Sequence, residues 1–195
     1  IGLFSTAGLA AAAITNQLAA VFFMVPIAVE QASTVRVGNY AGAGDRVNLT
    51  RSASASFWLG TAVTIATMAI LLIWPQQLVG LFLAAGDGMF DEVMALAIPM
   101  MLLTALFQIP DGLQAVAISV LRGLNDTRTP GMIAIASFWI TGVGVGAVFG
   151  FGFGWGPTGV WAGLLVGLSV AAVALSVRMW RAVGRVRDGG AILAA

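Results

Sequence analysis

The sequence contains no cysteine and no histidine. Disulfides, metal sites built from Cys or His, Cys/His nucleophile chemistry and histidine proton relays are therefore excluded. A Ser-His-Asp arrangement is excluded for the same reason. The chemistry of this chain must rest on carboxylates, arginines, amides and hydroxyls.

Charge is also scarce. Asp, Glu, Lys and Arg make up only 9% of the 195 residues, whereas soluble domains carry about 25%. Hydrophobic residues make up 59%, which indicates an integral membrane protein. The formal net charge is +1, so the overall charge does not suggest a nucleic-acid partner. No signal peptide is recognisable, and with Ile1 as first residue we expect either a fragment of a longer protein or a half-length chain that assembles in pairs.

The long apolar stretches predict an all-α fold, a polytopic membrane helix bundle. Five of them are long enough to cross roughly 30 Å of hydrocarbon, which takes about 20 helical residues. Residues Ile1–Thr6 are interpreted as the end of a sixth helix, followed by a tight turn at "STAGLAA" (5–11). The predicted spans lie near residues 9–35, 54–74, 93–121, 131–150 and 158–180.

The nine basic residues fall in alternate loops. The second predicted loop carries Asp87, Asp91 and Glu92 but no arginine, and the fourth carries no charge. By the positive-inside rule, the arginine-bearing loops and the C-terminus are expected to be cytoplasmic. The cluster after the last span is typical of a stop-transfer segment, with a lipid-headgroup or nucleic-acid patch as the alternative. The arginines are Arg36, Arg46, Arg51, Arg122, Arg128, Arg178, Arg181, Arg185 and Arg187.

Asp111 is the main candidate functional residue, because it is the only formal charge between Val93 and Leu121. An ionised Asp at a helix centre costs roughly 2.5–3.5 kcal/mol on insertion scales. Such residues usually face a bundle interior or a wet cavity and mark an ion or substrate path. The alternative is a structural Asp that is protonated or paired with a neighbouring helix.

Polar residues surround Asp111 at helical spacing. Gln108 and Gln114 lie three residues before and after it, so all three share one helix face. Pro110 removes a backbone donor and predicts a kink or a broken turn that frees the carbonyl of Leu106. A free carbonyl beside a carboxylate could bind a small cation such as Na⁺.

Glu30 is a second charged residue within a predicted span. It lies six residues before Arg36, roughly 9 Å along a helix, so it could reach the membrane interface or pair locally. A transport role is the less favoured alternative. The glycine-rich "GVGVGAVFGFGFGWG" (142–156) follows no strand, and we interpret it as helix packing followed by an outer turn.

Three segments together resemble the C-terminal lobe of multidrug and toxic compound extrusion (MATE) transporters, in the NorM-like branch. "MVPIAVEQASTVRVGNYAGAGD" (24–45) resembles a helix of that lobe and its following loop. "FQIPDGLQAVAISVLRGLNDTRTP" (107–130) resembles the tenth helix and is the most specific match. "GPTGVWAGLLVGLSVAA" (156–172) resembles the twelfth.

The resemblance implies a twelve-helix transporter of two six-helix lobes, of which residues 1–195 would be the C-terminal one without the start of its first helix. Members export cationic and amphipathic compounds in exchange for Na⁺ or H⁺ by alternating access. Asp111 matches the acidic position that the NorM-like branch uses for cation coupling. Some members carry a Tyr where this chain has Phe107, which offers cation–π contact but no oxygen and leaves protonation of Asp111 open.

The leading hypothesis is therefore the C-terminal half of a multidrug efflux antiporter in the inner membrane. It is not expected to be an enzyme and needs no cofactor beyond H⁺ or Na⁺. Its expected partners are a small cationic or amphipathic substrate, the bilayer, and a missing N-terminal lobe or second chain. A lipid-linked saccharide flippase is less favoured, because no Arg lies deep in a span to meet a pyrophosphate. A non-transporting scaffold with a structural Asp111 is the third alternative.

Overall fold

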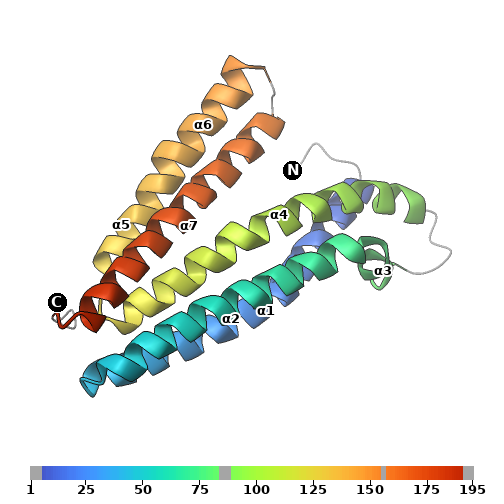
Figure 1. The fold of residues 1–195 in the computed structure, drawn as a ribbon. Coiled ribbons are helices and arrows are strands. Elements are labelled where there is room, and N and C mark those ends of the chain that lie inside the picture. Colours follow the sequence, from blue (N-terminus) through green and yellow to red (C-terminus); the bar gives the residue numbers. More distant parts are fainter. Residues whose placement is uncertain (1–5, 84–88, 155–156, 191–195) are drawn as a thin grey trace. The chain divides into compact units, whose positions relative to one another are not determined.

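A computed structural model describes residues 6–83, 89–154 and 157–190, and every regular element in these ranges is helical (Figure 1). This confirms the all-α prediction. Two short segments, η1 and η2, have π-helical hydrogen bonding. The elements are α1 (Thr6–Gly42), α2 (Arg46–Ile73), α3 (Pro75–Gly80), α4 (Phe90–Gly123), α5 (Arg128–Ala136), η1 (Ser137–Val143), α6 (Gly144–Ala147), η2 (Val148–Gly152) and α7 (Pro157–Arg187).

Five helical stretches are long and apolar enough to cross a membrane, as predicted, with α5 through η2 counting as one. Most extend a few residues beyond the predicted limits, because polar residues can continue a helix outside the hydrocarbon. The expected tight turn at 5–11 is wrong for residues 6–11, which are the start of α1. Half of these residues are alanine, a strong helix former, and the single Gly8 does not end the helix. The expected tail of an earlier helix lies, up to Ser5, outside the described residues.

Proline does not interrupt either helix that carries the acidic residues of interest. α1 continues through Pro26, and α4 continues as a helix through Pro110. Of the predicted kink or broken turn at Pro110, the broken turn is therefore wrong, and the kink stays a prediction. A proline removes one hydrogen bond of the helix, and the turns on both sides still hold the chain in a helical course.

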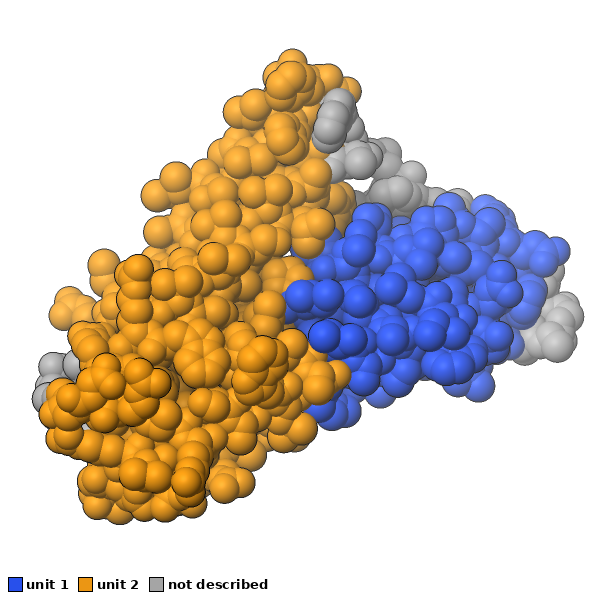
Figure 2. Space-filling model, in the orientation of Figure 1, with its two compact units in different colours: residues 1–25, 63–109 blue, residues 26–62, 110–195 orange. Residues whose placement is uncertain are grey.

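The described chain divides into two compact units (Figure 2). Three of the long helices contribute residues to both units. Unit 1 comprises residues 1–25 and 63–109, and unit 2 comprises residues 26–62 and 110–195. The division crosses α1 directly before Pro26 and α4 directly before Pro110. The apolar core of unit 1 consists of Ala7, Ala11, Ile14, Leu18, Leu71, Val79, Val93, Ala97, Met101 and Ala105.

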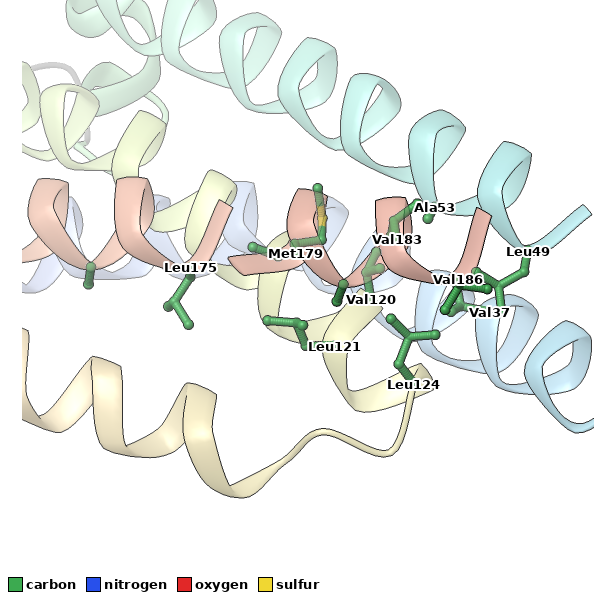
Figure 3. Close-up of a cluster of buried hydrophobic side chains, with 13 residues drawn as sticks. Val37, Leu49, Ala53, Val120, Leu121, Leu124, Leu175, Met179, Val183 and Val186 are labelled. Atoms are coloured by element: carbon green, nitrogen blue, oxygen red, sulfur yellow. The ribbon is translucent and has the colours of Figure 1, made fainter. Parts of the chain in front are cut away.

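The core of unit 2 is built from stripes of apolar side chains on four helices (Figure 3). On α7 the stripe recurs at every third or fourth position from Leu175 through Met179 to Val186, which keeps it on one helix face. On α4 the corresponding stripe consists of Ala117, Val120 and Leu121. The cluster comprises Val37, Leu49, Ala53, Ala117, Val120, Leu121, Leu124, Ala171, Leu175, Met179, Ala182, Val183 and Val186.

Glycines bring the α5–η2 stretch and α7 together at very short range. A Cβ atom added to Gly167 would lie 2.5 Å from the Cα of Gly142, and one added to Gly163 would meet the backbone of Gly146. A Cβ on Gly159 would lie 2.5 Å from the backbone nitrogen of Gly150. From one pair to the next the residue number falls on α7 and rises on the other stretch, so the two helical stretches are antiparallel. The three pairs together are here called the glycine contact. It agrees with the interpretation of the glycine-rich segment as helix packing.

The start of α2 is capped by Asp45. Its Oδ1 accepts a hydrogen bond from the backbone N–H of Asn48 (3.0 Å) and its Oδ2 accepts one from the Asn48 side chain (2.6 Å). The backbone hydrogen bond from Asn48, followed by the side-chain one, lowers the pKa of the Asp45 carboxyl below its usual value. The cap therefore contributes stability above the ordinary carboxyl pKa and loses it as the pH falls through the lowered one.

The turn between α4 and α5 is tied to α7 by an ion pair. Arg178 donates from Nε (2.8 Å) and Nη2 (2.6 Å) to Oδ2 of Asp126. The Asp126 side chain is only 9% exposed and that of Arg178 29%. Both charged groups are largely desolvated, so the charge of each is compensated mainly by the other.

We expect Asp126→Asn to destabilise the protein, because it leaves the Arg178 guanidinium largely covered and without its counter-charge. Allowing for the partial exposure of Arg178, the loss should be about 2 kcal/mol. Thermal unfolding in detergent should show a midpoint lower by about 4–8 °C. Asp188→Asn is the control, because it removes the carboxylate of an exposed ion pair with Arg187. Equal midpoints for the two variants would contradict a stabilising role of the Asp126–Arg178 pair.

Candidate functional site

Asp111 lies at the beginning of the part of α4 that belongs to unit 2. Its side chain is half-buried and makes no hydrogen bond or ion pair with any residue of the described ranges. Within those ranges, Glu30 is the charged residue close enough to interact with it electrostatically. Within the described part of the chain, Asp111 is thus a partly covered carboxylate without a counter-charge of its own.

The other predicted site residues also lie on α4, but they are distributed over both units. Gln114 belongs to unit 2 with Asp111, and its Oε1 is buried without a hydrogen-bond partner in the described part of the chain. Phe107 and Gln108 belong to unit 1, where Phe107 is half-buried and Gln108 is only 6% exposed. Unit 2 therefore brings together Asp111 and Gln114, one helical turn apart.

In unit 2, α1 runs beside α4 in a parallel direction. The Thr34 hydroxyl donates to the backbone carbonyl of Ser119 (3.2 Å), and a Cβ added to Gly38 would lie 3.6 Å from the carbonyl of Gly123. In both contacts the residue of α4 comes 85 positions after its partner on α1, so the register between the two helices is constant over this turn. Extended one turn back, the register places Glu30 beside Ala115, four residues or about 6 Å beyond Asp111.

Glu30 forms an ion pair with Arg122 across this helix pair. Arg122 Nη1 donates to Glu30 Oε1 at 3.3 Å, and the two side chains are 51% and 20% exposed, respectively. The arginine lies about two turns beyond the level of Glu30, and its long side chain points back toward the N-terminus of α4, as helical side chains do. Arg122 thereby places a positive charge near the acidic residues.

Sequence reasoning missed this ion pair and considered Arg36 as the local partner of Glu30. Spacing along one helix reveals partners only within that helix, whereas Glu30 and Arg122 are 92 residues apart. One available signal was that both residues lie in the half of their helix nearest an arginine-bearing loop. Without the register of α1 against α4, this signal did not single out Arg122.

The charges of this arrangement would favour a cation by electrostatics. Asp111 and Glu30 provide two carboxylates on successive levels of neighbouring helices, and Arg122 compensates only one of them. In the described ranges no group of three or more His, Cys, Asp or Glu residues could hold a metal ion. Two carboxylates on neighbouring helices suit a proton, a single small cation at Asp111 or an organic cation.

Comparisons with known proteins point to one family. The MatE family profile matches residues 1–148 of this chain. "Probable multidrug resistance protein NorM" of Brucella suis is 39% identical over 181 residues, which cover 93% of this chain and 38% of the relative. The protein of the same name from Xanthomonas campestris is 40% identical over 195 residues, covering 98% of this chain and 41% of the relative.

Solved structures of similar fold carry the same family name. A eukaryotic MATE transporter matches with a TM-score of 0.73 at 20% identity, over 93% of this chain and 41% of that one. A multidrug resistance MATE family transporter in an inward-facing conformation matches with a TM-score of 0.74 at 15% identity, over 90% of this chain and 39% of that one. The chain thus spans about two fifths of the length of the proteins it resembles. These relatives are named as resistance proteins and transporters, not as enzymes.

Proposed function

Since this chain belongs to the MatE family, we propose that it forms part of a multidrug efflux transporter that exports cationic or amphipathic compounds in exchange for H⁺ or Na⁺. Its relatives are named as probable multidrug resistance proteins, which supports a role in the removal of drugs. The chain contributes membrane-crossing helices and a carboxylate within one of them, which are the elements that such an exchange needs.

The observation that carries the proposal is the state of Asp111. A half-buried carboxylate that lacks a hydrogen bond and an ion pair within the described residues attracts a cation strongly, because the surrounding dielectric is low. A structural Asp would instead be expected to show a partner on a neighbouring helix. In unit 2 the arginine that reaches this region is paired with Glu30 and not with Asp111.

One carboxylate serves exchange because its charge can be neutralised by only one cation at a time. Binding of H⁺ or Na⁺ at Asp111 lowers the affinity for a cationic compound, and binding of the compound lowers the affinity for the ion. If the site opens alternately to the two sides of the membrane, an ion gradient drives export. Gln114 supplies an additional oxygen acceptor one turn away.

The proposal also covers the orientation of the chain in the membrane and the second lobe that it needs. The arginine-bearing loops and the C-terminus would face the cytoplasm of a cell with the protein in its inner membrane, as the positive-inside rule predicts. The substrate path would be completed by a second six-helix lobe, either encoded with this chain or supplied by a second chain. The present chain would correspond to the C-terminal lobe.

Transport into inverted membrane vesicles tests the proposed exchange. Vesicles from cells that express the full gene product are given either an acidic lumen at equal Na⁺ or a Na⁺-rich lumen at equal pH. We expect one of these gradients to drive uptake of tetraphenylphosphonium, and the uptake to stop when the gradient is dissipated. Uptake no greater than in vesicles without the protein, under both gradients, would contradict the antiporter.

A further inference from the structure

The Glu30–Arg122 pair stands directly beside the proposed cation site. The register of α1 against α4 places Pro26 at the level of Asp111 and Glu30 one turn further, on the side toward Arg122. The carboxylates of Glu30 and Asp111 interact electrostatically within unit 2. Three charges therefore follow one another along the direction of α4. The negative charge of Asp111 comes first, that of Glu30 follows at the level of Ala115, and the positive charge of Arg122 comes last.

Another cation can take the place of Arg122 at Glu30. It is a single hydrogen-bonded contact of 3.3 Å, and the Arg122 side chain is 51% exposed. Half-exposed ion pairs of this kind are weak, because water compensates the arginine when it leaves. Glu30 is 20% exposed and more covered than its partner, so a cation that takes the place of Arg122 would meet a partly desolvated carboxylate.

Two carboxylates on neighbouring helices, offset by about one turn along the helix axes, can neutralise two positive charges on one compound. A compound with a single charge needs only Asp111 and leaves the Glu30–Arg122 pair in place. A compound with two charges can engage both carboxylates, and the released Arg122 is compensated by water. The second charge then adds favourable interaction energy that the singly charged compound cannot gain.

We propose that Glu30 is a specificity-determining residue that favours doubly charged organic cations, and that Arg122 occupies it when no such compound is bound. The inference rests on the proposed function, because it assigns Asp111 to the first positive charge. It concerns the charge number of the substrate and holds for either coupling ion.

The experiment compares two compounds that differ in one charge. Hexamethonium carries a quaternary ammonium at each end of a six-carbon chain, and hexyltrimethylammonium carries only one. Gradient-driven uptake of both is measured in inverted vesicles that contain the full-length gene product. The variants are Glu30→Gln, the double variant Glu30→Gln/Arg122→Gln, and Asp111→Asn. Asp188→Asn, which alters the exposed ion pair with Arg187, is the matched control.

We expect the unaltered protein to prefer hexamethonium and Glu30→Gln to lower its uptake about tenfold relative to hexyltrimethylammonium. The double variant should show the same loss, because it still lacks the second carboxylate. It removes both charges of the pair, so it carries the test if Glu30→Gln alone does not fold. Asp188→Asn should keep the preference.

Three results would overturn the inference. The first is an unaltered protein without preference for hexamethonium. The second is an equal loss of both compounds in Glu30→Gln. The third is a preference restored in the double variant, which would mean that Glu30 only compensates Arg122. Asp111→Asn separates the two proposals. Full transport of both compounds by this variant contradicts the proposed function itself. Loss of both compounds agrees with the proposed function, independently of the results for the Glu30 variants.

Discussion

Replacing Asp111 with Asn is expected to lower efflux of cationic compounds about 30-fold or more, because losing the charged partner of a desolvated cation costs roughly 2–5 kcal/mol. Asn has nearly the shape of Asp but carries no charge and binds neither a proton nor a metal cation with comparable strength. Asp111 makes no hydrogen bond or ion pair within the described residues, so the neutral side chain removes no contact of that kind. We therefore expect normal amounts of protein in the membrane together with a loss of transport.

Efflux of a fluorescent cation from loaded cells measures this effect, with the amount of protein determined in the same cells. Asp91→Asn is the matched control, since Asp91 is an exposed carboxylate in the first turn of the same helix. Asp111→Glu should keep part of the activity, because it retains the charge. Undiminished efflux in Asp111→Asn, at equal expression, would favour a structural Asp111 and remove the basis of the antiporter proposal.

The second large effect concerns folding. Gly163→Ala is expected to destabilise the protein by about 3 kcal/mol or more, since overpacking of a well-packed contact costs 1–3 kcal/mol and more where the obstacle cannot move. The added Cβ would meet the backbone of Gly146 and lie 2.8 Å from the carbonyl oxygen of Gly142. These are backbone atoms, so the two helices must separate along the glycine contact to make room.

Thermal unfolding in detergent and the yield of monodisperse protein measure this loss. Gly184→Ala on the same helix and Gly144→Ala on the partner stretch are matched controls, because a Cβ at either position would meet no atom within 4 Å apart from its adjacent residues and the nearby backbone of its own helix. Alanine has a higher helix propensity than glycine, so both controls should be neutral or slightly stabilising. If Gly163→Ala unfolds at the same temperature as these two, the close approach of the helices does not contribute to stability.

Local properties of the sequence were sufficient for the class of protein and for the number of spans. Hydropathy over about 20 residues depends only on neighbouring residues, and the five spans appear where it predicted them. The family was identifiable because "FQIPDGLQ" keeps a distinctive order of residues around Asp111. The broken turn at Pro110 was a wrong local inference, since the adjacent turns of α4 maintain the helix.

Partners between distant segments were beyond such reasoning. The ion pair of Glu30 with Arg122 depends on the parallel register of α1 and α4, and Asp126 finds Arg178 through the position of α7. The assignment of Phe107 and Gln108 to one unit and of Asp111 to the other likewise follows from packing.

The sequence by itself determined that this is an all-helical membrane protein of a transporter family with one conspicuous acid, since each of these follows from composition, hydropathy and a short motif. Only the tertiary structure decided which charges compensate one another and which glycines meet. The physical reason is that a helix presents several faces of similar polarity, and the neighbour that each face meets is selected by packing along its whole length.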